Sequence, residues 1–242
     1  MKSSKRKHED DELVPIIPSE FETVQGIEHR NTGILLGFGI TALALIISFL
    51  FAYRYSVLDS TMIITALASS ISFFVFSLRT RILALYLTHH ESITKDKTFL
   101  KDIWRLTLRA DASNEVGLAL ILVGIFLFLM IIELVIPAVV MMIILNLLFG
   151  RWSFQRMEVG VKERFKAMPH TRALISRFRN FARFMIVFTR VWIPVFMTTY
   201  YLVAQYSEIF PADSFYWVLL FLGGVVLSVV YVFRTEEQVS II

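Results

Sequence analysis

The stretch from Gly117 to Phe149 constrains the fold of this chain more than any other part of the sequence. Over its 33 residues, Glu133 carries the only ionisable side chain. A single helix of this length would measure about 50 Å, whereas the hydrocarbon core of a bilayer is about 30 Å thick. The stretch therefore predicts either one steep helix that overshoots a membrane or two crossings joined by a turn near Glu133 and Pro137.

The distribution of charge favours two crossings. Segment 79–112 holds seven Lys or Arg and four acids, a net charge of +3, and segment 151–183 holds nine against two, a net charge of +7. Short loops rich in Lys and Arg stay on the cytosolic side of a membrane. Two crossings place both basic segments on that side, and Pro137 then suits the first turn of the second helix.

The composition supports a membrane protein as a class. Hydrophobic residues make up 56% of the 242 residues, and Phe alone occurs 22 times. A soluble domain of this size could not bury so much apolar surface. The chain contains no Cys, which excludes disulfides, thiolate metal ligands and Cys nucleophiles.

We therefore predict an all-α, polytopic integral membrane protein with six transmembrane helices arranged as three antiparallel hairpins and with both termini cytosolic. Interfacial amphipathic helices are expected in the cytosolic segments. The membrane domain 33–234 is expected to contain spans at 33–53, 60–78, 112–132, 137–154, 183–206 and 215–233. The basic cytosolic segments are 79–111 and 155–182, and the cytosolic tails are a flexible segment 1–32 and a short segment 235–242. No feature identifies which membrane holds the protein.

Small residues follow one face of the first predicted span. They recur at steps of four, four, three and four residues, at Gly33, Gly37, Thr41, Ala44 and Ser48. In a bilayer such a ridge lets two helix backbones approach closely. We expect it to pack within the monomer, with a contact in a homo-oligomer as the alternative.

Three polar side chains are candidates for an intramembrane site. Arg190 lies about two turns inside the fifth span, and Asn146 is expected at the same depth. A cation at the centre of a span usually has a partner or reaches water, so we predict a contact between Arg190 and Asn146. Glu133 lies nearer the outer surface. These residues either form a substrate, ion or gating site, or they face headgroups and outer water without a further role.

Basic residues also form a stripe before the fifth span. Arg172, Arg179 and Arg183 share one helix face that leads toward the membrane. Each such cation contributes about 1 kcal/mol of attraction to anionic headgroups. Interleaved basic and aromatic residues also bind nucleic acid. Beside a membrane, lipid is the simpler partner, and we predict no nucleic-acid partner.

Catalytic and metal-binding patterns do not occur in the predicted spans, which contain neither His nor Asp. His89, His90 and Glu91 are adjacent in sequence, but consecutive helical residues point about 100° apart and do not converge on one ion. We predict no catalytic residue, no metal and no cofactor. A lipid-modifying enzyme that uses His89, His90 or His170 at the cytosolic interface is the least favoured class.

The leading functional hypothesis is a non-enzymatic membrane scaffold or complex subunit. Its basic cytosolic face would bind anionic lipids or a partner, such as another membrane protein. The alternative is a small oligomeric transporter or channel that uses Arg190, Asn146 and Glu133. Arg79 and Arg81 end the second span and open the first basic cytosolic segment.

Overall fold

A computed structural model of the chain describes residues 21–53, 57–88, 97–144, 192–193, 195–204, 206 and 215–239. The labelled elements are α1 (Phe21–Tyr53), α2 (Val57–Thr88), α4 (Lys97–Ile131), the π-helical turn η2 (Tyr200–Ala204) and α7 (Phe215–Val239). A short helix, Val135–Ile144, follows α4. No strand occurs in this part of the chain, which confirms the all-α class for the residues described.

Three of these helices contain segments that are long and apolar enough to cross a membrane. The segments are Glu22–Tyr53, Ser60–Thr88 and Arg105–Ile131. Helices Val135–Ile144 and Phe215–Val230 are apolar but shorter. The fold is therefore compatible with an integral membrane protein. Residues 145–154 of the predicted span 137–154, and residues 183–191, 194 and 205 of the predicted span 183–206, lie outside the described residues.

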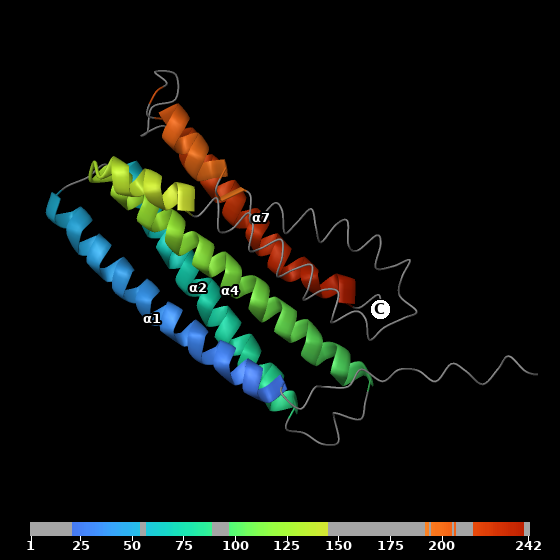
Figure 1. The fold of residues 1–242 in the computed structure, drawn as a ribbon. Helices are drawn as coiled ribbons and strands as arrows, with labels where there is room; N and C mark the ends of the chain where they lie inside the picture. The colour runs from blue at the N-terminus through green and yellow to red at the C-terminus, as the bar shows by residue number, and fades with distance from the viewer. Residues whose placement is uncertain are drawn as a thin grey trace, which may run out of the picture.

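Helices α1, α2 and α4 run side by side as a bundle, and α7 lies against α4 (Figure 1). The pairing of α2 with α4 is the most extensive, and α1 packs mainly on α2. Consequently α4 is the most deeply buried of the three long helices, whereas most of α1 faces outward. Buried apolar side chains from α2 and α4 form the centre of the core.

Large side chains of α2 fit against glycines of α4 at a seven-residue interval. A Cβ atom added at Gly124 would lie 2.8 Å from Cδ2 of Leu67, and one added at Gly117 would lie 2.9 Å from Cε1 of Phe74. Leu67 and Phe74 are fully buried. Small residues let helix backbones approach closely where lipid supplies no hydrophobic drive between helices. Arg81 lies a further seven residues along α2 from Phe74.

Two serines link α2 and α4 through hydrogen bonds. The Ser77 hydroxyl donates to the Ala110 carbonyl, and the Ser113 hydroxyl donates to the Phe73 carbonyl, each at 2.8 Å. Both serines are fully buried. One bond runs in each direction between the helices, so the pair fixes their relative register.

The chain turns where α4 ends, at Glu133. Glu133 has a positive φ of 61°. The Leu134 amide donates to the Leu129 carbonyl at 2.9 Å, and the Glu133 amide donates to the Met130 carbonyl at 3.2 Å. This pair of bonds is the Schellman motif, which usually has Gly at the left-handed position. The helix that follows, yellow in Figure 1, heads back from the end of α4 and contains Pro137 in its first turn.

Aromatic side chains form a second part of the core between α4, residues 192–204 and α7. Centroid distances between neighbouring rings range from 5.2 to 6.3 Å among Phe126, Trp192, Phe196, Tyr200, Trp217 and Phe221. Gly224 provides the space for Trp192, because an added Cβ would lie 2.6 Å from the indole ring. The aromatic contacts therefore attach α7 to the bundle.

The helices extend further than the sequence predicts. Helix α1 begins at Phe21, although the sequence placed residues up to 32 in a flexible tail. Helix α2 continues to Thr88, and α4 runs without a break from Lys97, across the expected boundary between a cytosolic segment and a span at 112. No Pro interrupts these extensions, and contacts between the helices continue beyond the predicted spans, as between Gln25 and Arg81.

Candidate functional site

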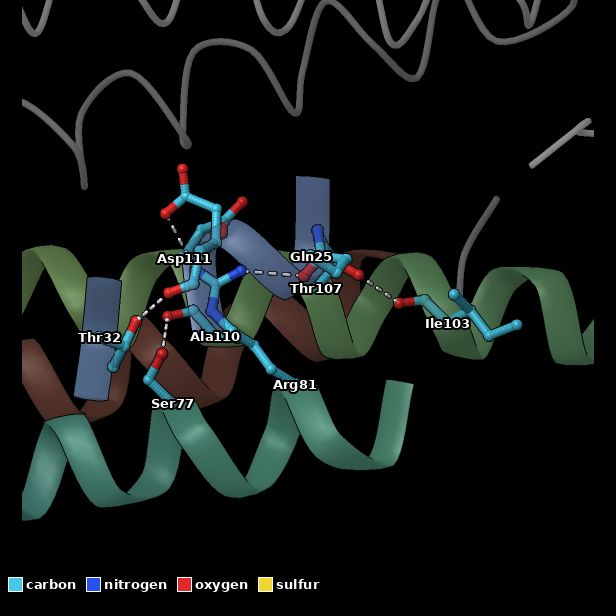
Figure 2. Close-up of polar contacts among 9 residues, drawn as sticks. Gln25, Thr32, Ser77, Arg81, Ile103, Thr107, Ala110 and Asp111 are labelled. Carbon is cyan, nitrogen blue, oxygen red and sulfur yellow. Dashed lines mark hydrogen bonds and ion pairs between the residues drawn. The ribbon is translucent and has the colours of Figure 1, made fainter. Parts of the chain in front are cut away.

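Arg81 is a fully buried cation held between three helices. Its side chain is 1% exposed. The Nη1 group donates to Oε1 of Gln25 on α1 at 2.9 Å, and the Nη2 group donates to Oδ1 of Asp111 on α4 at 2.7 Å (Figure 2). Burial of a charge is costly unless it is paired and hydrogen-bonded, and both conditions are met. We call Gln25, Glu28, Arg81 and Asp111 the arginine clamp.

A second carboxylate completes the arginine clamp. Oε2 of Glu28 lies 3.9 Å from Nη2 of Arg81. The side chains of Glu28 and Asp111 are 30% and 33% exposed, so both carboxylates reach solvent although the cation does not. One cation faces two acids, which gives the clamp a formal charge of −1. This excess is tolerable because the two acids stay hydrated.

Hydroxyl groups around the clamp bond to backbone carbonyls of their own helices. Thr32 donates to the Glu28 carbonyl at 2.8 Å, and Thr107 donates to the Ile103 carbonyl at 2.9 Å (Figure 2). Both threonines are fully buried. Their hydroxyls therefore need no further partner.

Three buried polar atoms near this level of the bundle have no hydrogen-bond partner among the described residues. They are Nε of Arg81, Oδ1 of Asn114 and Nδ1 of His29. An unpaired buried donor or acceptor costs about 1–3 kcal/mol. The region is thus polar, and the described residues satisfy its hydrogen-bonding groups only in part, in contrast to the apolar core between α2 and α4.

The clamp lies about one hydrocarbon thickness from the turn at Glu133. Asp111 precedes the end of α4 by 20 residues, which corresponds to about 30 Å of helix. Arg81 follows the start of α2 by 24 residues, or about 36 Å. A bilayer with the turn at one surface would therefore place the clamp at the opposite surface. There its carboxylates reach water while Arg81 stays enclosed.

The described residues contain only part of the site predicted from sequence. Glu133 is exposed at the turn after α4. Asn146 and Arg190 lie outside the described residues, so their contact stays a prediction. The basic stripe of Arg172, Arg179 and Arg183 lies outside them as well.

The ridge of small residues on α1 faces outward in the part of the chain that the structure describes. An added Cβ at Gly33 or Gly37 would meet no atom within 4 Å. Thr41, Ala44 and Ser48 are also exposed. The glycine of α1 that does contact the bundle is Gly39, where an added Cβ would lie 3.2 Å from Ile121. Packing of α1 on the described helices thus uses a different face.

The sequence analysis did not identify the arginine clamp. It placed Arg81 at the end of a span and Gln25 and Glu28 in a flexible tail. One signal was available in the sequence: Leu67, Phe74 and Arg81 follow one another at the seven-residue interval of a packed helix seam. An arginine in such a seam requires an acid on a neighbouring helix, and Asp111 meets this requirement.

The described residues contain no group of three or more His, Asp or Glu side chains able to hold a metal ion. The fold belongs to the class of α-helical proteins with several helices suited to a membrane. The chain matches no protein-family model, no curated protein and no solved structure.

Proposed function

We propose that this protein is a non-enzymatic scaffold or complex subunit of a membrane, and that its basic cytosolic face holds anionic lipids or a partner protein. The proposal includes six spans in three hairpins, with both termini cytosolic. The turn at Glu133 supports this topology, because an apolar helix follows the reversal and both basic segments then share one side.

The arginine clamp is the observation that carries the proposal. Its buried cation joins α1, α2 and α4 through hydrogen bonds to Gln25 and Asp111. A group engaged in this way stabilises one arrangement of helices and is poorly suited to bind and release an ion. The described polar network thus favours a scaffold over a site that binds and releases an ion.

The composition of α4 also supports a scaffold. From residue 116 to residue 131, this most buried of the long helices carries no polar side chain. A pathway for ions or polar substrates requires polar groups or water along its length. A continuous apolar surface at the centre of the bundle supports a scaffold over a transporter.

Introduced cysteines test this choice, because the natural chain has none. Ala66→Cys and Ser70→Cys place a thiol at fully buried positions of α2 that face the bundle. Ala68→Cys and Ser72→Cys place one on the exposed face of the same helix, and Glu133→Cys marks the outer turn. A scaffold predicts labelling by a water-soluble thiol reagent at 133 alone. Labelling at 66 and 70, together with ion flux in liposomes, would support the transporter.

Lipid preference provides a second test. The four Trp residues of the full chain serve as donors to acceptor-labelled lipids in vesicles. We expect stronger energy transfer to phosphatidylglycerol than to phosphatidylcholine, and a weaker difference at high salt, because salt screens surface charges. Equal transfer to both lipids at low salt would contradict lipid binding by the basic face.

A further inference from the structure

The guanidinium group of Arg81 has a buried donor that the arginine clamp does not use. A guanidinium carries five N–H donors. Nη1 donates to Gln25 and Nη2 donates to Asp111, whereas Nε is buried and has no hydrogen-bond partner among the described residues. The Arg81 side chain is 1% exposed, so bulk solvent does not reach this atom. A buried donor in this state keeps the full cost of its lost hydration.

An unused acceptor lies one turn from the same ion pair. Oδ1 of Asn114 is buried and has no hydrogen-bond partner among the described residues. Asn114 follows Asp111 by three residues on α4, so the Cβ atoms of the two residues are about 5–6 Å apart. Nε of Arg81 shares one edge of the planar guanidinium with Nη2, the nitrogen that bonds Asp111. The donor and the acceptor therefore both lie beside the Asp111 carboxylate.

The chemistry of these two atoms identifies the class of ligand that bridges them. The bridging molecule has to accept a hydrogen bond from Nε of Arg81 and donate one to Oδ1 of Asn114. An anion does not donate, and the formal charge of −1 on the clamp also disfavours it. A metal cation does not accept from an N–H group. Water does both, and a water molecule with two such bonds joins atoms about 5–6 Å apart.

We infer that the arginine clamp contains a binding site for one ordered water molecule, between Nε of Arg81 and Oδ1 of Asn114. Buried waters in proteins make about three hydrogen bonds to buried polar groups that have no other partner. The third partner is the Asp111 carboxylate, which has about four lone-pair sites and accepts from water without releasing Arg81. Asp111 is one-third exposed, so water enters from its side. The site thus adds a second link between α2 and α4, whichever function the protein has.

The experiment uses the full chain in liposomes, with isotope-labelled arginine, and measures magnetisation transfer from water protons to the arginine Nε atoms by solid-state NMR. Arg81 is assigned by its contact with the Asp111 carboxylate. Exposed Arg30 and Arg79 provide the transfer rate of a hydrated guanidinium. We expect the rate at Arg81 Nε to lie within about twofold of theirs in spite of its burial, because the water is in direct contact with this atom.

Two variants on α4 test the contribution of Asn114. N114L removes the acceptor and keeps the size of the side chain, and we expect the transfer to Arg81 Nε to slow at least about threefold. S113A is the matched control, because Ser113 is the preceding buried residue and its hydroxyl already donates to the Phe73 carbonyl. The control should leave the transfer to Arg81 Nε unchanged.

Three results would overturn the water site. Transfer to Arg81 Nε that is several times slower than to Arg30 and Arg79 in the natural protein means that no water contacts this atom, and this measurement needs no variant to fold. Rapid transfer that persists in N114L means that Asn114 does not hold the water. Equal slowing in S113A and N114L assigns the effect to a disturbed contact between α2 and α4. None of these results bears on the proposed scaffold.

Discussion

Arg81 Nη2 lies 2.7 Å from Asp111 Oδ1, although 30 residues separate the two in sequence. This bond connects α2 and α4 at the level where the carboxylate meets solvent and the guanidinium does not. The two residues thus share a bond but not an environment, and substitutions at either end should have different costs.

We expect Asp111→Ala to lower the free energy of unfolding by about 3 kcal/mol, because it leaves a buried cation without its closest partner. Arg81→Met should restore part of this loss in the double variant, since it removes the stranded charge. Unfolding in mixed micelles, monitored by circular dichroism, measures the free energy of unfolding of the single and the double variant. Asp102→Ala is the control, because it breaks a more exposed pair with Arg105 and should cost less than about 1 kcal/mol. Equal losses of unfolding free energy in Asp111→Ala and Asp102→Ala would contradict the burial of Arg81 in the clamp.

The glycines of α4 provide a second prediction. Gly117→Ala places a methyl group within 3.0 Å of the Phe74 ring, and we expect a loss of about 1–3 kcal/mol from overpacking. Phe74→Leu should relieve part of this loss in the double variant. Gly37→Ala on α1 meets nothing within 4 Å and should leave stability unchanged or slightly raised. The same unfolding assay distinguishes these cases, and a comparable loss at 37 would contradict the outward orientation of that face.

The serine links between α2 and α4 should each contribute about 1 kcal/mol. Ser77→Ala and Ser113→Ala remove one interhelical bond apiece. Ser72→Ala removes a hydroxyl that bonds to the Ala68 carbonyl within its own helix, so its effect should be smaller. Thermal unfolding of the three variants in one detergent provides the comparison. A larger effect at 72 than at 77 or 113 would contradict the described register.

Glu133 should tolerate glycine well. Its φ of 61° is strained for a residue with a Cβ atom, whereas glycine adopts it freely. We expect Glu133→Gly to raise the free energy of unfolding by about 1 kcal/mol and Glu133→Val to lower it by a similar amount. In liposomes, Glu133→Gly also tests the transporter alternative, because loss of a measured flux in a stable variant would assign the carboxylate a role in conduction.

Much of the architecture could be predicted from the pattern of apolar residues. The long runs in α1, α2 and α4, and the turn marked by Glu133 and Pro137, are visible in the sequence, because lipid requires continuous apolar segments and a break in them is conspicuous. Helix boundaries were less predictable. A hydropathy pattern marks only the apolar part of a helix, but α1 begins at Phe21, and Gln25 in this extension contacts Arg81 of α2.

The arginine clamp could not be predicted in full, because it depends on contacts between helices and not on the hydropathy pattern of one segment. Arg81 at the edge of a span has the sequence signature of a residue in water, and its burial depends on Gln25 and Asp111 arriving from two other helices. The seven-residue interval from Phe74 to Arg81 indicates that Arg81 lies in the helix seam, but it does not identify Asp111 as the acid that pairs with it. The tertiary pairing of distant residues is information that a local sequence pattern does not contain.

The order of the clamp residues along the chain has a consequence for biogenesis. Translation releases Gln25, Glu28 and Arg81 before Asp111, so the newly synthesised α1–α2 pair contains Arg81 and two of its three partners. The strongest contact forms only when α4 emerges from the ribosome. The arginine clamp is therefore complete only after α4 has been synthesised and has packed on α1 and α2.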